Sequence, residues 1–194
     1  MLAQNQPVSE TLIADTSICV SQRQAPLYDL YGRDPDEAWI IDAATTSSRD
    51  VPADQPLYGH VTFGTGLPAD LTVGVHKAVG GESDLPNPGE ILAAAIAACL
   101  DSSTRMIANR LAIRLEHLEV TVKLRVDVRG TLRMDRNVPV GFQGADIAVC
   151  ISAAPGVTEA QLDMLIKAAE QSCVMLQTLR HPPEYCLTRE PQSG

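Results

Sequence analysis

The sequence is poor in aromatic residues and in positive charge. Only 4% of its 194 residues are Phe, Trp or Tyr, and 15 Lys and Arg are set against 24 Asp and Glu, which gives a net charge of -9 at pH 7. Proteins that bind nucleic acid usually present a basic surface with aromatic side chains that stack on bases. We therefore expect no nucleic-acid partner.

Targeting signals and long hydrophobic runs are also missing. The first twenty residues, MLAQNQPVSETLIADTSICV, lack the basic segment and sustained apolar run of a secretory signal. The longest apolar run, residues 91–100, is about half the length of a bilayer-spanning helix. These features predict a cytoplasmic protein without a membrane partner. Because 45% of the residues are hydrophobic, one sizeable core and one main domain are expected.

The cysteines do not form a metal-binding or disulfide pattern. The five are Cys19, Cys99, Cys150, Cys173 and Cys186, an odd number without a CxxC pair or a Cys/His cluster of zinc-site spacing. A cytoplasmic setting keeps most thiols reduced, so neither structural disulfides nor a metal or organic cofactor is expected. The nucleophile motif GxSxG of many hydrolases is also absent from the sequence.

The first half of the chain predicts strands followed by a long helix. The first 38 residues are polar and irregular, although residues 9–12 could open a short helix. Strand patterns follow at AWIIDAATTSS (38–48), LYGHVTFGT (57–65) and ADLTVGVHKAV (69–79). Asn87 and Pro88 then start a helix that should run to about Leu111, with Glu90 completing a capping box. The first half of this helix is apolar on all sides, which predicts that protein surrounds it.

The second half predicts a hairpin, a second helix and a last strand. EVTVKLRVDVR (119–129) alternates without exception and should pair antiparallel with DIAVCISA (146–153). A capping box at Thr158 and Gln161 starts a helix whose apolar stripe includes Cys173 and which ends before Pro182. EYCLTRE (184–190) is the last expected strand. This order indicates an α+β fold in which helices pack against mainly antiparallel sheets. We expect this domain to occupy residues 39–190, with an N-terminal extension (1–38) before it and a C-terminal tail (191–194) after it.

Spacing alone favours a packing role for Cys99 and Cys173. A buried cysteine packs well among alanines, and burial leaves its thiol unreactive. The two cysteines together are more informative, because PNPGEILAAAIAACLDSS (86–103) and AEQSCVMLQTLR (169–180) resemble two motifs of the OsmC/Ohr family of thiol-dependent hydroperoxide reductases. The resemblance extends in element order from about Ile40 to Arg189. It implies that Cys99 is the peroxidatic thiol and that Cys173 resolves it.

The resemblance also implies an arginine that stabilises the thiolate and a glutamate that orients the arginine. Arg49, in TTSSRD, is the candidate arginine, and Glu90 is the candidate glutamate. The family usually has its acid directly after Asn-Pro, where this chain has Gly89, so Glu90 is rotated by about 100° around the helix. A capping role for Glu90 is at least as strong an interpretation. Val174 also departs from the proline that often follows the resolving cysteine.

Three functions remain open on the sequence. The first is a peroxidase that reduces an organic hydroperoxide through a sulfenate and an intramolecular disulfide, which a dithiol reductant such as dihydrolipoamide or a dithiol protein reopens. The resemblance implies that such an enzyme is an intertwined homodimer in which the early strands of one subunit cover the long central helix of the other. The second is a dimeric binding or stress-associated protein of the same fold. The third is a transferase or hydrolase that needs Cys99 but not Cys173.

Overall fold

The computed structural model describes residues 18–64 and 69–190. Its elements in chain order are α2 (Val20–Arg33), η1 (Pro35–Ala38), β1 (Ala44–Thr46), β2 (Tyr58–Phe63), β3 (Asp70–Gly74), η2 (Lys77–Val79), α3 (Pro88–Arg110), β4 (Leu115–Arg125), α4 (Val128–Thr131), β5 (Gly144–Ala153), α5 (Glu159–Ser172) and α6 (Val174–Arg180). Two antiparallel sheets form, with strand orders β1-β2-β3 and β4-β5. The predicted α+β class and the hairpin of the two long strands are confirmed.

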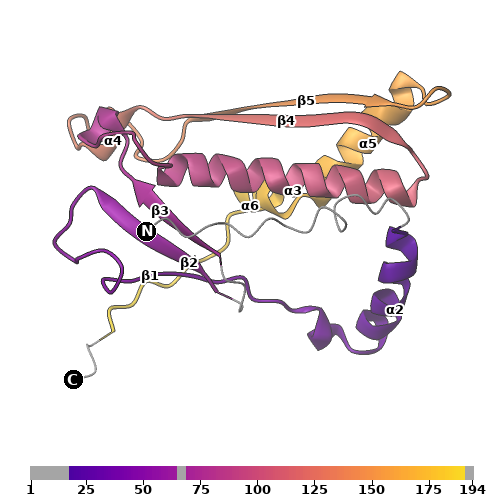
Figure 1. Cartoon of the computed structure of the whole chain (residues 1–194), viewed down its shortest axis with the longest axis horizontal. Coiled ribbons are helices and arrows are strands. Elements are labelled where there is room, and N and C mark those ends of the chain that lie inside the picture. Colours follow the sequence, from indigo (N-terminus) through magenta and orange to yellow (C-terminus); the bar gives the residue numbers. More distant parts are fainter. Residues whose placement is uncertain (1–17, 65–68, 191–194) are drawn as a thin grey trace.

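The long helix α3 organises the molecule. The β4–β5 hairpin lies along one side of α3, α5 and α6 pack beside it, and the β1–β3 sheet lies near its N-terminal end (Figure 1). One stripe of α3 is buried, at every fourth residue: Ile96, Leu100, Thr104 and Ala108. Thr104 donates its hydroxyl to the carbonyl of Leu100 at 2.7 Å, so this polar side chain is satisfied inside the core.

The start of α3 is fixed by the predicted capping box. The Asn87 side chain accepts the amide of Glu90, and the Glu90 carboxylate accepts the amide of Asn87 at 2.9 Å. Gly89, at the second helical position, is covered by an aromatic ring, because a Cβ built there would lie 3.0 Å from Cζ of Phe142. The ring therefore occupies space that a larger residue at position 89 would need.

The second helix also starts at its predicted capping box but does not run through as one helix. Thr158 and Gln161 cap α5, which ends at Ser172. Cys173 then adopts an extended conformation (φ -77°, ψ 105°), and α6 begins at Val174. The uninterrupted stripe predicted through Cys173 is therefore wrong: this residue lies at a junction between two helices, although its side chain still points into the core.

Several predicted strands differ from those in the structure. The pattern at 38–48 yields only the three residues of β1, and β3 ends at Gly74, before the 3-10 turn η2. β4 begins at Leu115 and ends at Arg125, because the chain turns into α4 and no longer pairs with β5. The strand expected at 184–190 is absent from the described part of the chain. This segment has no hydrogen-bonded neighbour there, and a strand needs one.

The expected irregular extension contains a helix. α2 lies against the C-terminal end of α3, where the Asn109 side chain accepts the amide of Val20 at 2.8 Å and donates to the carbonyl of Ile18 at 2.9 Å. The guanidinium of Arg110 lies 5.8 Å from the ring centre of Tyr28. The expectation for residues 9–12 lies outside the described residues.

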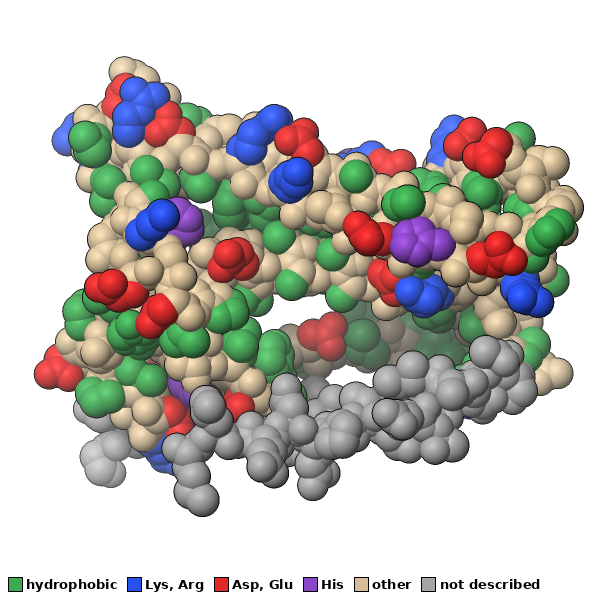
Figure 2. Space-filling model, turned by 45° about the horizontal axis from the view of Figure 1, so that its top comes forward, with side chains coloured by type: hydrophobic (Ala, Val, Ile, Leu, Met, Phe, Trp, Pro, Cys, Tyr) green, Lys and Arg blue, Asp and Glu red, His purple; other side chains and the backbone are tan. Residues whose placement is uncertain are grey.

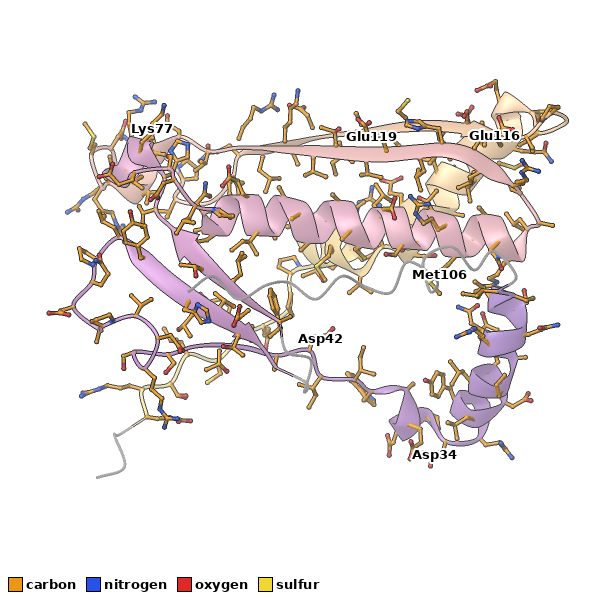
Figure 3. All side chains as sticks on the ribbon, in the orientation of Figure 1. Asp34, Asp42, Lys77, Met106, Glu116 and Glu119 are labelled. Carbon is orange, nitrogen blue, oxygen red and sulfur yellow. The ribbon has the colours of Figure 1, made fainter. Side chains whose placement is uncertain are left out.

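The residues that the structure describes leave one face of α3 exposed. Ala94, Ala98, Ser102 and Met106 are exposed, and Met106 projects away from the hairpin, whose Glu116 and Glu119 lie on its outer face (Figure 3). By length and composition α3 could also cross a membrane, but this is weak evidence because the core helix of a globular protein passes the same test.

Replacing Leu165, which is 0% exposed in the core cluster with Ala108 and Leu162, should destabilise the fold strongly. We expect Leu165→Ala to lower the free energy of unfolding by about 2–5 kcal/mol, because it leaves a cavity. The neighbouring Met164 is 64% exposed, so Met164→Ala should change this free energy by no more than about 0.5 kcal/mol. Urea unfolding measures both, and equal losses would contradict the assigned core.

The contact between Gly89 and Phe142 predicts a coupling between the two positions. Alanine is the better helix former, but its Cβ meets the Phe142 ring. We therefore expect Gly89→Ala to be more favourable in the Phe142→Ala background than in the wild type, by about 0.5–2 kcal/mol. A double-mutant cycle by urea unfolding tests this, and an equal effect in both backgrounds would show that the ring does not restrict position 89.

Candidate functional site

A cysteine of α3 and a cysteine at the junction of two helices meet in the core beneath the hairpin. Cys99 is carried by α3, and Cys173 lies at the junction of α5 and α6. Cys173 is 0% exposed and forms a buried cluster with Leu100 and Ala169, against which Cys99 packs. Cys99 itself is only half-buried. One thiol is thus enclosed by protein, while its neighbour remains accessible.

The surroundings of Cys173 act on its thiol in opposite directions. Burial, the largest cause, raises the pKa of Cys173, and a hydrogen bond and charge interaction with Cys99 raise it further. Backbone amides of Leu176 and Met175, in the first turn of α6, lower it. The net direction is upward, so Cys173 keeps its proton more readily than an ordinary cysteine.

Arg49 lies on a turn between β1 and β2. Its side chain is exposed, and its backbone amide donates to Oγ of Ser47 at 3.1 Å. Among residues 18–64 and 69–190, the structure assigns its guanidinium no hydrogen bond or ion pair. A single chain therefore does not bring Arg49 to Cys99.

Glu90 is held at the start of α3. Its carboxylate accepts the backbone amide of Asn87 at 2.9 Å and the side-chain amide of the same residue at 2.8 Å. Cys99 follows nine residues later, which places it about 14 Å along the axis and about 180° around the helix. The geometry supports the capping role and does not bring Glu90 to the thiols.

The other charged and thiol side chains considered from the sequence are not assigned a contact with Cys99 or Cys173. Arg105 forms a bidentate pair with Asp101, at 2.7 and 3.0 Å, as its spacing in the sequence predicts. Cys150 and Cys186 are exposed, and Cys19 is half-buried beside α2. The described part of the chain holds no group of three or more His, Cys, Asp or Glu side chains that could bind a metal ion.

An open pocket of about 880 Å³ lies beside the first half of α3. Its apolar wall includes Phe63, Leu71, Ile91, Ala95 and Ala98, the last of which directly precedes Cys99. Lys77 and His76 contribute polar groups at the end of the molecule where α3 begins (Figure 3). Hydrophobic side chains lie on both sides of a hollow in this face of the molecule (Figure 2). The surface beside the first half of α3, up to Ala98, is therefore largely apolar.

Two adjacent thiols of unequal exposure can carry out two-electron redox chemistry. The accessible sulfur can be oxidised, and the enclosed sulfur can then close a disulfide with it. The resemblance named both thiols as the reacting pair, and their role stays a prediction. The sequence did not identify the α5–α6 junction or the ring of Phe142 over Gly89, because neither has a local sequence signal that separates it from ordinary packing.

Comparisons with known proteins identify the family and the fold. The model of the family described as OsmC-like protein matches residues 80–187. A solved organic hydroperoxide resistance protein from Elizabethkingia anophelis is 25% identical, with a TM-score of 0.54, over 74% of this chain and 91% of that chain. An OsmC-like protein from Mycoplasma pneumoniae is 14% identical, with a TM-score of 0.58, over 74% of this chain and 89% of that one.

A third structure gives the same fold. An organic hydroperoxide resistance protein, OsmC, from Legionella pneumophila is 24% identical, with a TM-score of 0.51, over 73% of this chain and 90% of that one. A search of curated proteins finds no match. The family model covers more than half of the chain, and the sequence motifs at both cysteines point the same way. The chain belongs to the OsmC-like family.

Proposed function

We propose that this chain is a thiol peroxidase that reduces organic hydroperoxides through Cys99 and Cys173. The observation that carries the proposal is the contact between a half-buried thiol on α3 and a fully enclosed one at the α5–α6 junction. The apolar pocket that ends beside Ala98 supports an organic substrate. Structural likeness to organic hydroperoxide resistance proteins supports the same class of substrate.

The proposed reaction proceeds in two steps on the protein. The Cys99 thiolate attacks the terminal oxygen of the hydroperoxide, the O–O bond breaks, and the alkoxide takes a proton and leaves as an alcohol. Cys99 is then a sulfenic acid, oxidised by two electrons. Cys173 attacks this sulfur, water leaves, and a disulfide forms. A dithiol reductant, of the dihydrolipoamide type or a dithiol protein, reopens it by thiol exchange in a reducing compartment such as the cytoplasm.

A second copy of the chain would complete the site. Trp39, Ile40 and Ile41 follow η1 and are 83%, 77% and 85% exposed. The segment from η1 to β1 runs roughly parallel to α3 and apart from it (Figure 1). Large apolar side chains at such exposure indicate an interface. In an intertwined homodimer, this segment and Arg49 of one copy would reach α3 of the other, so that the arginine could stabilise its thiolate. Glu90 takes no step here, because its carboxylate is held in the capping box.

Substitution of the two cysteines separately tests the reaction. With cumene hydroperoxide or hydrogen peroxide and dihydrolipoamide, wild type should turn over, with the organic peroxide preferred. Cys99→Ser should fall to the rate of buffer, because the attacking sulfur is lost. Cys173→Ser should consume one equivalent of peroxide and stop at the sulfenate, which is measured by peroxide loss and intact mass.

Cys150→Ser provides the matched control, because this thiol is exposed on β5 and should leave turnover unchanged. A wild type that neither turns over nor loses a thiol at position 99 or 173 would rule out the peroxidase and favour a binding protein of this fold. Full activity in Cys173→Ser would instead point to a nucleophilic enzyme that uses Cys99 alone.

The assembly is tested by mass in solution. Sedimentation or light scattering should give close to twice the 20.8 kDa chain mass. Ile41→Asp places a charge in the apolar segment and should shift the protein toward monomer, whereas Ala148→Asp, at an exposed position of β5, should not. A wild-type protein that stays monomeric at micromolar concentration would contradict the dimer.

A further inference from the structure

The charges of this acidic chain are unevenly distributed along it. Residues 123–140 carry five Lys and Arg against two Asp, although the whole chain has a net charge of -9. Residues 29–42 carry five Asp and Glu against one Arg. We call these two segments the basic end and the acidic end.

The two segments lie at opposite ends of α3. The basic end includes α4, which contacts η2 beside the start of α3 (Figure 1). The acidic end begins within α2, which lies against the C-terminal end of α3. Lys77 of η2 and Asp34, which precedes η1, mark this separation (Figure 3).

The distance between the two ends prevents them from neutralising each other within one chain. The 23 residues of α3 correspond to a length of about 34 Å. Exposed charges are largely screened beyond about 10 Å at 0.1 M salt. A partner that carries the opposite charge must therefore come from outside the chain.

Both ends expose charged side chains that have no ion-pair partner. Asp36, Glu37, Arg133 and Arg136 are exposed, and within the described residues none of them forms an ion pair. Large apolar side chains are exposed beside these charges: Leu132, Met134 and Val140 at the basic end, and Trp39, Ile40 and Ile41 at the acidic end. Exposed apolar side chains among charged ones are typical of a protein interface, and here the charges on the two surfaces are opposite.

We propose that the acidic end of one copy docks on the basic end of a second copy, so that the two α3 helices of the dimer run antiparallel. In a two-fold dimer of this kind, the start of each α3 lies beside the end of the other, and the contact forms twice. Parallel helices would instead place like charges against each other at both ends, which is unfavourable. This inference deepens the proposed assembly and rests on it.

The N-terminal extension is anchored in a way that suits this role. The Asn109 side chain binds the amide of Val20 and the carbonyl of Ile18, which fixes the start of α2 to α3 of the same copy. The acidic end is therefore held near the end of α3. Residues 18–38 precede the part of the chain that the family model matches, so the contact gives this extension a role of its own in assembly.

Charge reversal at each end tests the contact. The acidic-end variant carries Asp36→Lys and Glu37→Lys. The basic-end variant carries Arg133→Glu and Arg136→Glu, and a combined variant carries all four substitutions. The dissociation constant of the full-length dimer is measured by sedimentation at low and at high salt. Where the dimer is too tight for this, the rate of subunit exchange between isotopically labelled copies is measured by native mass spectrometry.

Each end variant should weaken the dimer about 10- to 100-fold at low salt, because two repulsive contacts replace two attractive ones. High salt should reduce this difference, because it screens exposed charges. The combined variant should return to within about threefold of the wild type, because the exchanged charges are again opposite and the two effects are not additive.

A matched control makes the same change of charge away from the contact. Glu116→Lys with Glu119→Lys replaces two exposed carboxylates on the outer face of the hairpin and should leave the dimer unchanged (Figure 3). Thermal unfolding checks that each variant is folded. If a reversed variant fails to fold, Asp36→Asn with Glu37→Gln replaces it and should weaken the dimer in the same direction by a smaller factor.

The outcomes separate this inference from the proposals on which it rests. End variants that dimerise as tightly as the control, or a combined variant as weak as the end variants, would overturn the docking and leave the dimer and the peroxidase in place. A wild type that is monomeric would overturn the assembly and the docking together. Peroxide turnover is not part of the measurement, so its absence would count against the peroxidase alone.

Discussion

Burial of a single stripe of α3 is the constraint on which the site depends. Ile96, Leu100, Thr104 and Ala108 recur at every fourth residue and pack beneath the β4–β5 hairpin and beside α5. Cys99 directly precedes Leu100, so it lies at the edge of this stripe and not in its centre. This position explains why its sulfur is half-buried, close enough to the core to meet Cys173 and close enough to the surface to meet a substrate.

Burial of only one stripe also explains why apolar residues of α3 stay exposed. Burying one stripe leaves Ala94 and Ala98 on the opposite side of α3 exposed among the described residues, and Trp39 and Ile41 are exposed as well. The first half of α3 is therefore apolar on all sides in sequence, although the described residues bury only one stripe of the helix.

The sequence predicted the features that neighbouring residues determine, and it missed features that depend on residues far away in the chain. Both capping boxes, at Asn87 and Thr158, were found because their groups lie three residues apart, and the β4–β5 hairpin was found because its alternation is strict. The strand expected at 184–190 is absent, since a strand needs a hydrogen-bonded partner strand and the local sequence pattern does not show whether one is available. The proximity of Cys99 and Cys173 was expected only from the motif resemblance, because two residues separated by 73 others cannot be placed together from their sequence spacing. Arg49 stays a prediction for the same reason.

The junction at Cys173 has a mechanical consequence. A cysteine inside a continuous helix is held by the backbone hydrogen bonds of that helix, so moving its sulfur strains the whole element. Cys173 belongs to neither α5 nor α6, and its extended backbone joins two helices that keep their own hydrogen bonds. In the proposed reaction, a disulfide with Cys99 would therefore require a change only in the backbone of this junction, while α5 and α6 keep their own hydrogen bonds.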